Sequence, residues 1–210
     1  PSQVMTTDFI GSLGGLIALA RGEADIAGVH LWDERTGQYN LPFIERVLPN
    51  VSVVVVNLVK REQGLLVTAG NPQGLAGLAD LTRPGVTFVN RQPGSGTRVW
   101  LDAHLKRLGV DPRWIAGYER EARTHLEVAR LVAEGAATVG LGIRAAAGAH
   151  GLDFVPLWTE RYDLVARAEM SSDACFKALL EVLDSAQFRA ALEALGGYDL
   201  SETGAYTSLG

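Results

Sequence analysis

The stretch Phe88–Arg98, FVNRQPGSGTR, joins a short apolar run to a helical pattern and decides how the rest of the chain is interpreted. The run Val86–Val89 is rich in β-branched residues and predicts a buried strand. A turn rich in Pro and Gly follows, and a helix is expected to begin at Ser95 and to stop at Gly109. A strand–turn–helix unit of this kind directs free backbone N–H groups and the positive end of the helix dipole at one point. The sequence therefore predicts an anion site here.

The side chains of this turn suit an anion. Ser95 and Thr97 supply hydroxyl donors, and Arg91 or Arg98 supplies a planar positive charge. The spacing of the glycines fits neither a nucleotide P-loop nor a dinucleotide fingerprint. Ser95 has Pro93 and Thr97 at the two positions where a nucleophile elbow has glycines. The simpler alternative is a strand-to-helix turn in which Ser95 only caps the helix.

Two further helix starts offer donors of the same kind. Gly11-Ser12 follows an expected strand at Val4–Ile10, and glycines in the first helical turn leave room for close approach of a ligand or of another segment. Thr124 and Glu127 stand three residues apart, as in a capping box at the start of another helix. Close packing of helix on sheet explains the glycines equally well, so both interpretations of the first helix stand.

Composition limits the classes of partner. The chain has 210 residues, 47% of them hydrophobic, which is enough for one large or two small domains with a real core. Its net charge of −5 and the lack of a basic block argue against direct contact with nucleic acid. Because no apolar run reaches membrane-spanning length and no signal peptide is recognised, a cytoplasmic protein is expected. The alternative is an extracytoplasmic binding protein whose signal peptide is absent from this sequence.

Neither a metal site nor a nucleophilic centre is expected. The four histidines, His30, His104, His125 and His150, do not pair with Cys or carboxylates at metal-ligand spacing. Cys175 stands among apolar neighbours and is interpreted as a core thiol. No nucleophile–base pair or carboxylate dyad is evident, so we expect a protein without catalytic residues, cofactor or metal.

Strands alternate with helices along the whole chain, which is typical of α/β folds with parallel sheets. Val51–Val59 is nearly unbroken β-branched sequence, and Gln63–Ala69 predicts a separate strand. Phe154–Leu157 and Tyr162–Ala166 predict two more short strands. Two amphipathic helices are expected near the end of the chain.

Six motifs occur in an order shared with one family. They resemble the periplasmic-binding-protein-like domain of molybdate-type regulators and, more distantly, the phosphate and tungstate binding proteins. In the latter an Arg stands four residues before Ser-Gly-Thr, and Arg91 reproduces that spacing. The resemblance covers nearly the whole chain. The motifs are Gly11-Ser12, ADIAGVH at 24–30, NRQPGSGTR at 90–98, HLEVA at 125–129, VGLGI at 139–143 and ERYDLV at 160–165.

The resemblance implies a type II binding-protein fold, in which two α/β lobes are joined by two crossover strands, close about a hinge and hold the ligand in the cleft between them. Lobe one is expected to comprise residues 1–82 and 164–210, without the first strand and helix usual in that fold, and lobe two residues 83–163. A small anionic ligand, a fused or partner helix-turn-helix or molybdopterin-biosynthesis domain, and a homodimer are further expectations. The expected ligand-binding residues are Ser12, Arg91, Gly94, Ser95, Gly96, Thr97, Thr124, His125 and Tyr162.

The favoured function is binding or sensing of a small oxyanion of the molybdate or tungstate type. The alternatives are a domain associated with molybdenum-cofactor biosynthesis and a scaffold used only for dimerisation. Strand alternation is expected to turn Asp163 away from a site that Tyr162 enters. Only hydrogen-bond donors would then face the ligand. Such a site favours proton-free molybdate, tungstate or sulfate over phosphate, because phosphate carries a proton near neutral pH and that proton needs an acceptor.

Overall fold

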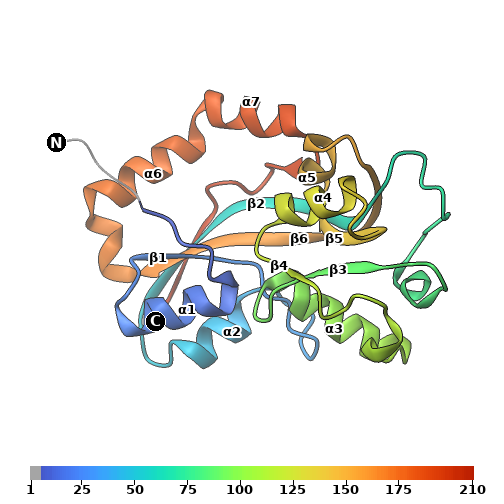
Figure 1. The fold of residues 1–210 in the computed structure, drawn as a ribbon. Helices are drawn as coiled ribbons and strands as arrows, with labels where there is room; N and C mark the ends of the chain where they lie inside the picture. The colour runs from blue at the N-terminus through green and yellow to red at the C-terminus, as the bar shows by residue number, and fades with distance from the viewer. Residues whose placement is uncertain (1–5) are drawn as a thin grey trace. The chain divides into compact units, whose positions relative to one another are not determined.

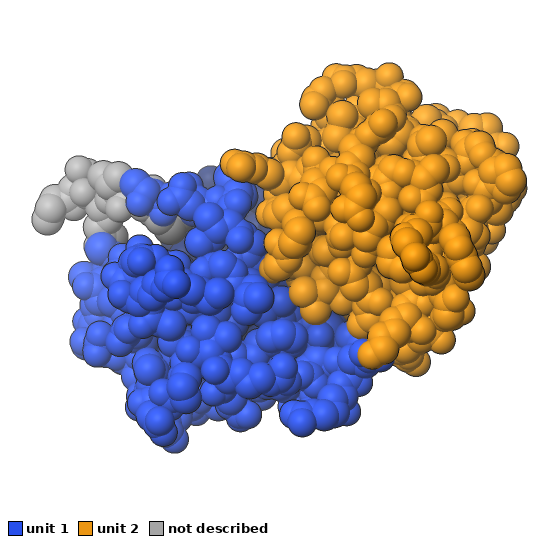
Figure 2. All heavy atoms as spheres, turned by 60° about the horizontal axis from the view of Figure 1, so that its bottom comes forward, with its two compact units in different colours: residues 1–60, 161–194, 198–210 blue, residues 61–160, 195–197 orange. Residues whose placement is uncertain are grey.

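The computed structural model describes residues 6–210 and shows a mixed α/β fold, which confirms the predicted class (Figure 1). The chain forms two compact units (Figure 2). Unit 1 comprises residues 1–60, 161–194 and 198–210, and unit 2 comprises residues 61–160 and 195–197.

Unit 1 has β6 between β1 and β2, and β8 pairs with β2. β1 runs antiparallel to β6 with Ile26 opposite Ala166, and β8 runs antiparallel to the first part of β2. Helix α6 covers this sheet, since its Phe176 and Leu183 pack with Val54 in one buried cluster. The elements are α1 (Gly11–Arg21), β1 (Ile26–Val29), α2 (Leu41–Val47), the first part of β2 (Val53–Val67), the last part of β6 (Asp153–Arg167), a 3-10 turn (Ala168–Ser172), α6 (Ala174–Asp184), α7 (Ala186–Leu195), β7 (Tyr198–Asp199) and β8 (Tyr206–Leu209).

Unit 2 has the strand order β2-β5-β3-β4. β3 runs parallel to both β5 and β4, whereas β2 runs antiparallel to β5 with Gln63 opposite Ile143. The sheet is therefore mixed, and the expectation of parallel sheets was wrong for β1, β2, β6 and β8. The elements are the last part of β2, a 3-10 turn (Leu78–Thr82), β3 (Phe88–Arg91), α3 (Gly96–Leu108), a 3-10 turn (Pro112–Trp114), β4 (Glu121–Ala122), α4 (His125–Ala133), β5 (Val139–Ile143), α5 (Arg144–Ala149) and the first part of β6.

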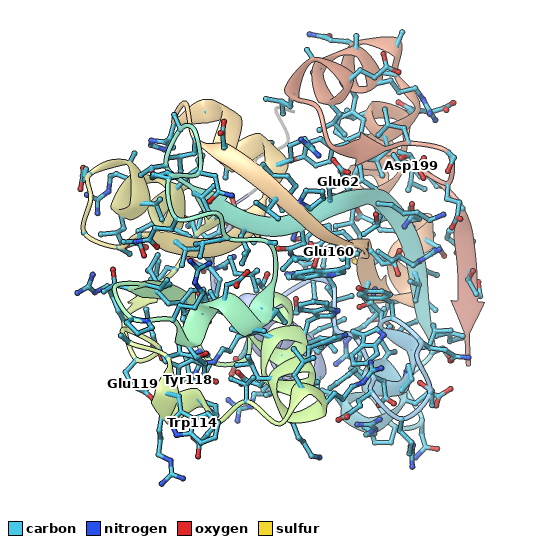
Figure 3. The ribbon with its side chains drawn as sticks, turned by 90° about the vertical axis from the view of Figure 1, so that its right-hand side faces the viewer. Glu62, Trp114, Tyr118, Glu119, Glu160 and Asp199 are labelled. Atoms are coloured by element: carbon cyan, nitrogen blue, oxygen red, sulfur yellow. The ribbon has the colours of Figure 1, made fainter. Side chains whose placement is uncertain are left out.

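Two long strands replace the four short ones that the sequence predicted. β2 and β6 each have 15 residues, and each continues from one unit into the other. Charged residues interrupt the apolar pattern in the middle of both strands, but Arg61 of β2 forms an ion pair with Glu160 of β6. Figure 3 labels Glu160 on its strand. Pairing keeps these charges compatible with a continuous strand. The units divide the chain at 60 and 160 rather than at the expected 82 and 163, because the end of β2 pairs with β5.

Two smaller expectations were also wrong. Residues 6–10 of the strand expected at Val4–Ile10 form no strand, and the first two residues of that range lie outside the described part of the chain. Cys175 is exposed in the first turn of α6, because Phe176 takes the buried position beside it. Among residues 6–210, no helix is both long and apolar enough to cross a membrane.

The packing of α4 on β5 gives a stability prediction. Gly140→Ala is expected to lower the free energy of unfolding by about 1–3 kcal/mol, because a Cβ there would overlap the side chain of Val128 and crowd that of Val89. Gly148→Ala is the matched control: its Cβ would meet open space in α5, and alanine is more stable than glycine in a helix by about 0.5–1 kcal/mol. Chemical denaturation followed by circular dichroism measures both. Equal stability of the two variants would contradict this packing.

Candidate functional site

Helix α3 begins as the sequence predicted. Ser95 is its N-cap, and the Ser95 Oγ accepts a hydrogen bond of 3.3 Å from the backbone N–H of Arg98. Gly94 has a φ of 80°, which glycine adopts without strain and which turns the chain from β3 into the helix. At the other end Gly109 closes α3 in the left-handed conformation. The turn therefore delivers Gly96 and Thr97 to the first helical positions, whose N–H groups have no intrahelical acceptor.

The two hydroxyls at this helix start are both buried and both used as acceptors. Ser95 and Thr97 are each 1% exposed. The Thr97 Oγ1 accepts a hydrogen bond of 3.0 Å from the Gln63 Nε2 of β2. Neither hydroxyl donates to an acceptor within residues 6–210. Since a hydroxyl carries one donor besides its acceptor lone pairs, both hydroxyl hydrogens are available to a ligand.

Strand register brings the site residues of unit 2 to one edge of its sheet. Arg91, the last residue of β3, lies opposite Ala122, the last residue of β4. Gln63 lies opposite Ile143, the last residue of β5. The carboxyl ends of three parallel strands thus meet at one edge, where α3 and α4 begin. Ligands of α/β sheets bind at edges of this kind.

Arg91 supports the backbone beside the site. Its side chain is buried, its Nε donates to the carbonyl of Ala122 at 3.3 Å, and its Nη2 donates to the carbonyl of Arg123 at 2.8 Å. These bonds hold the connection from β4 to α4. Direct contact of Arg91 with an anion, expected from the sequence, stays a prediction.

Arg98 fixes the first turn of α3 and is committed to protein groups. Its Nη1 donates to the Arg91 carbonyl at 3.3 Å and its Nε donates to Asp102 at 3.0 Å. The guanidinium lies over the ring of Tyr118, 4.2 Å from the centroid, and the Tyr118 hydroxyl donates to Asp102. Figure 3 labels Tyr118 in this part of unit 2. Burial and the hydrogen bond to Asp102 raise the pKa of Tyr118 to about 12.

The start of α4 is capped as predicted, with one difference. The Thr124 Oγ1 accepts from the backbone N–H of Glu127 at 3.0 Å. The Glu127 carboxylate accepts from the N–H of Arg123, one residue before the cap, instead of from that of Thr124 itself. His125 is the first residue of the helix and lies against Gly142 of β5. The predicted residues Arg91, Gly94–Thr97, Thr124 and His125 therefore share this edge of unit 2.

The other two predicted residues, Ser12 and Tyr162, come together in unit 1. Ser12 is buried in the first turn of α1, and its Oγ accepts from the backbone N–H of His30 at 3.2 Å. The His30 ring lies 5.2 Å from that of Tyr162. The Tyr162 hydroxyl lies directly over Gly28, where any Cβ would overlap it. His30 thus links the two predicted residues, a role that the sequence analysis did not assign to it.

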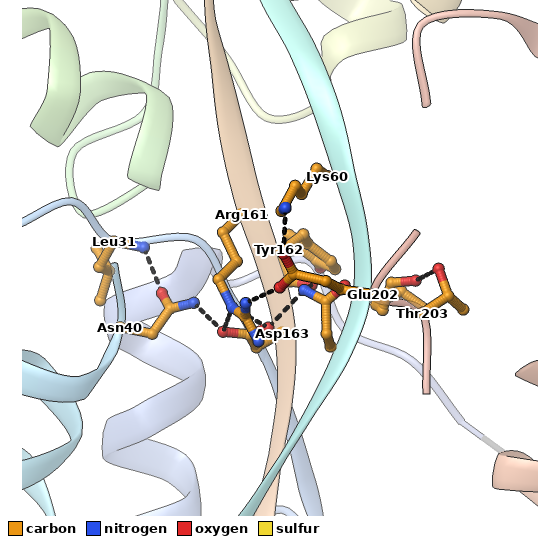
Figure 4. Close-up of polar contacts among 10 residues, drawn as sticks. Leu31, Asn40, Lys60, Arg161, Tyr162, Asp163, Glu202 and Thr203 are labelled. Atoms are coloured by element: carbon orange, nitrogen blue, oxygen red, sulfur yellow. Dashed lines mark hydrogen bonds and ion pairs between the residues drawn. The ribbon is translucent and has the colours of Figure 1, made fainter. Parts of the chain in front are cut away.

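Asp163 is held by three side chains of unit 1, and its expected orientation away from a site that Tyr162 enters stays a prediction. It accepts from the Asn40 Nδ2 at 2.7 Å, from the Asn57 Nδ2 at 2.8 Å and from the Arg161 Nε at 2.9 Å (Figure 4). Arg161 in turn pairs with Glu202. The carboxylate of Asp163 is 2% exposed. Its acceptor capacity is therefore used within unit 1.

Gln63 is the residue of the site that sequence reasoning missed. It is the first residue of the strand expected at Gln63–Ala69 and directly follows the charged residues 60–62, which separate the two expected strands. In the structure it is fully buried within β2 and bonded to Thr97. The signal in the sequence that could have identified it is that a polar residue begins an otherwise apolar predicted strand.

The chain resembles several known proteins. The profile of the PBP superfamily domain matches residues 1–184. The uncharacterized protein YvgK of Bacillus subtilis is 40% identical over 194 residues, which are 92% of this chain and 62% of YvgK. The chain thus spans less than two thirds of that relative's length.

Two solved structures share the fold. One, from Clostridium perfringens, is assigned to phosphate ABC transport and holds bound phosphate; it has a TM-score of 0.62 at 13% identity and covers 90% of this chain and 84% of its own. The other is the tungstate ABC transporter of Geobacter sulfurreducens, with a TM-score of 0.57 at 19% identity, covering 85% of this chain and 80% of its own. At such identities the likeness is one of fold.

The bonds of Arg91 give a second stability prediction. Arg91→Met is expected to lower the free energy of unfolding by about 1–3 kcal/mol, because the carbonyls of Ala122 and Arg123 each lose a charged donor. Arg107→Met, at an exposed position in the last turn of α3, is the control and should change stability by less than about 0.5 kcal/mol. Thermal and urea denaturation test this. A neutral Arg91→Met variant would show that the guanidinium does not hold the backbone.

The raised pKa of Tyr118 predicts a loss of stability in alkali. The unfolded tyrosine ionises near pH 10 and the folded one near pH 12, so the folded state holds its proton more tightly. The contribution is complete below about pH 10 and is lost as pH rises towards about 12. Tyr118→Phe should flatten this part of the curve of unfolding free energy against pH. The same slope in both proteins would assign the loss to other groups.

Proposed function

The chain belongs to the PBP superfamily, and from this premise we propose that it binds a small oxyanion at the start of α3 in unit 2. One observation carries the proposal: Ser95 and Thr97 are buried at a helix N-terminus, and each uses its hydroxyl oxygen as an acceptor within the protein. Their hydrogens, together with the first N–H groups of the helix, form a donor set. Such a set is complementary to the oxygens of an anion.

Electrostatics favours an anion at the same point. The dipole of α3, a helix of 13 residues, places partial positive charge at its first turn. Burial of Ser95 and Thr97 strengthens each hydrogen bond to a charged ligand, because little water competes for the donors. Arg91 adds a full positive charge at the same edge of the sheet. The overall charge of −5 does not oppose this, since local dipoles and donors govern a small site.

The ligands named for the two structural neighbours agree with this chemistry. Phosphate and tungstate are both tetrahedral oxyanions, and the two neighbours are named for them. We therefore propose a binding protein rather than an enzyme. Molybdate or tungstate preference, a role in molybdenum-cofactor biosynthesis, fused domains, dimerisation, a ligand held between lobes and the cellular location stay predictions.

Thr97→Val tests the proposal, because it keeps the shape of the side chain and removes the donor. The variant is expected to bind oxyanions about 10- to 100-fold more weakly, the effect of one lost hydrogen bond to a charged group. Isothermal titration calorimetry with sulfate, phosphate, molybdate and tungstate measures it. Thr82→Val, at a half-buried position where the hydroxyl bonds the nearby Ala79 carbonyl, is the matched control. Failure of the wild type to bind any of the four anions, or unchanged affinity of Thr97→Val, would overturn the proposal.

A further inference from the structure

Gln63 presents a buried acceptor beside the proposed oxyanion site. Its side chain is fully buried, and its Nε2 is held by the Thr97 Oγ1 in the first turn of α3. The other end of the amide, Oε1, has no hydrogen-bond partner within residues 6–210. Because Nε2 is fixed at the helix start, the amide oxygen lies at the start of α3 as well. Buried amide oxygens in native proteins have partners, so this one calls for a group that is absent from the chain itself.

Trp158 presents a buried donor on the same side of the sheet. Its ring stacks on Trp100 of α3, with centroids 3.4 Å apart and planes within 7°. Its Nε1 is buried and also has no partner within the described residues. Trp100 follows Thr97 by three positions, so the two lie on one face of α3. On that face of α3, Thr97 contacts Gln63 and Trp100 contacts Trp158.

The ion pair between Arg61 and Glu160 fixes how the two residues face each other. Arg61 of β2 and Glu160 of β6 touch, so their side chains leave the sheet on one side. Side chains two residues apart along a strand share a face. Gln63 bonds Thr97 and Trp158 stacks on Trp100, so both side chains contact the first two turns of α3. One acceptor and one donor, each without a described partner, therefore lie near the start of this helix.

The two groups differ in what they can accept or give. An amide oxygen only accepts, and an indole N–H only donates. A single hydroxyl satisfies both, because its hydrogen donates to the amide while its oxygen accepts from the indole. A proton-free oxyanion satisfies only the indole and leaves the amide oxygen buried against negative charge. The pair therefore distinguishes ligands by the presence of an O–H group.

We propose that Gln63 and Trp158 recognise a hydroxyl on the bound oxyanion, with Gln63 Oε1 as acceptor and Trp158 Nε1 as donor. The inference rests on the proposed function. It assigns the ligand to oxyanions that carry an O–H at neutral pH, whether a P–OH as in phosphate or a hydroxyl on a neighbouring carbon as in a 2-hydroxy carboxylate. It leads to the opposite preference from the one expected from the sequence, which assumed a site of donors alone, and the calorimetry below decides between them.

Two pairs of anions that differ in the hydroxyl test the wild type. Calorimetry should give tighter binding of phosphate than of sulfate, or of glycolate than of acetate, by about tenfold or more. The pair that shows the difference tells which source of the hydroxyl the site accepts. Equal or weaker binding of the hydroxyl-bearing anion in both pairs overturns this inference alone. Absence of binding of all four anions overturns this inference, whereas the proposed function falls only if molybdate and tungstate also fail to bind.

Variants locate the effect. Gln63→Leu and Trp158→Phe, which keeps the ring stack, should each bring the affinity ratio of the preferred pair close to one. Gln63→Glu keeps an acceptor and should retain or raise the ratio, because a carboxylate accepts from O–H and repels a proton-free dianion. Gln73→Leu is the matched control: Gln73 also has a buried Oε1 without a described partner, but its amide bonds to Gly85, away from α3. Its ratio should stay that of the wild type.

Circular dichroism and melting temperature show which variants fold. If Gln63→Leu does not fold, Trp158→Phe and Gln63→Glu still decide the question. The assignment is overturned if Trp158→Phe keeps the wild-type affinity ratio and Gln63→Glu loses the preference for the hydroxyl-bearing anion. It is also overturned if a folded Gln63→Leu keeps the wild-type affinity ratio.

Discussion

The register between β2 and β5 is the constraint on which the candidate site depends. A slip of one residue would move every side chain of β2 to the opposite face of the sheet. Gly64 prevents this, because a Cβ at its position would overlap the backbone carbonyl of Val155. Only glycine fits there, so Gln63 and Leu65 are held on the other face. The absence of one side chain thus directs the Gln63 amide to the start of α3, where it bonds Thr97.

Local signals predicted the parts of the fold that local chemistry decides. The Ser95 cap, the Gly109 stop and the Thr124 cap were all confirmed, since each depends on a few neighbouring residues. The length of β2 and β6 could not be predicted in this way. Their charged residues interrupt the apolar pattern, and only the contact of Arg61 with Glu160, 99 residues apart in sequence, makes a continuous strand compatible with them. The antiparallel pairings of these strands depend on the same distant contacts.

The candidate site was predictable to the same extent. Hydroxyls and glycines at a helix start indicate donors, and the structure brings those residues of unit 2 to one sheet edge. The acceptor came from a different strand. Gln63 was expected only as the first residue of a strand after a charged run, and its pairing with Ile143 leaves no trace in the local pattern. Arg91 holds two backbone carbonyls, a role that the anion motif does not predict.

A neutral acceptor such as Gln63 imposes a graded selectivity rather than an absolute one. The helix dipole and the hydroxyls of Ser95 and Thr97 attract any oxyanion, whether or not it carries a proton. A carboxylate in the place of Gln63 would add repulsion between full charges, which falls off slowly with distance in a buried site. An amide adds only the cost of an unsatisfied or unfavourably placed oxygen, which ends within hydrogen-bond range. The donors therefore set how strongly the site binds anions, and the amide, paired with Trp158, sets which of them it prefers.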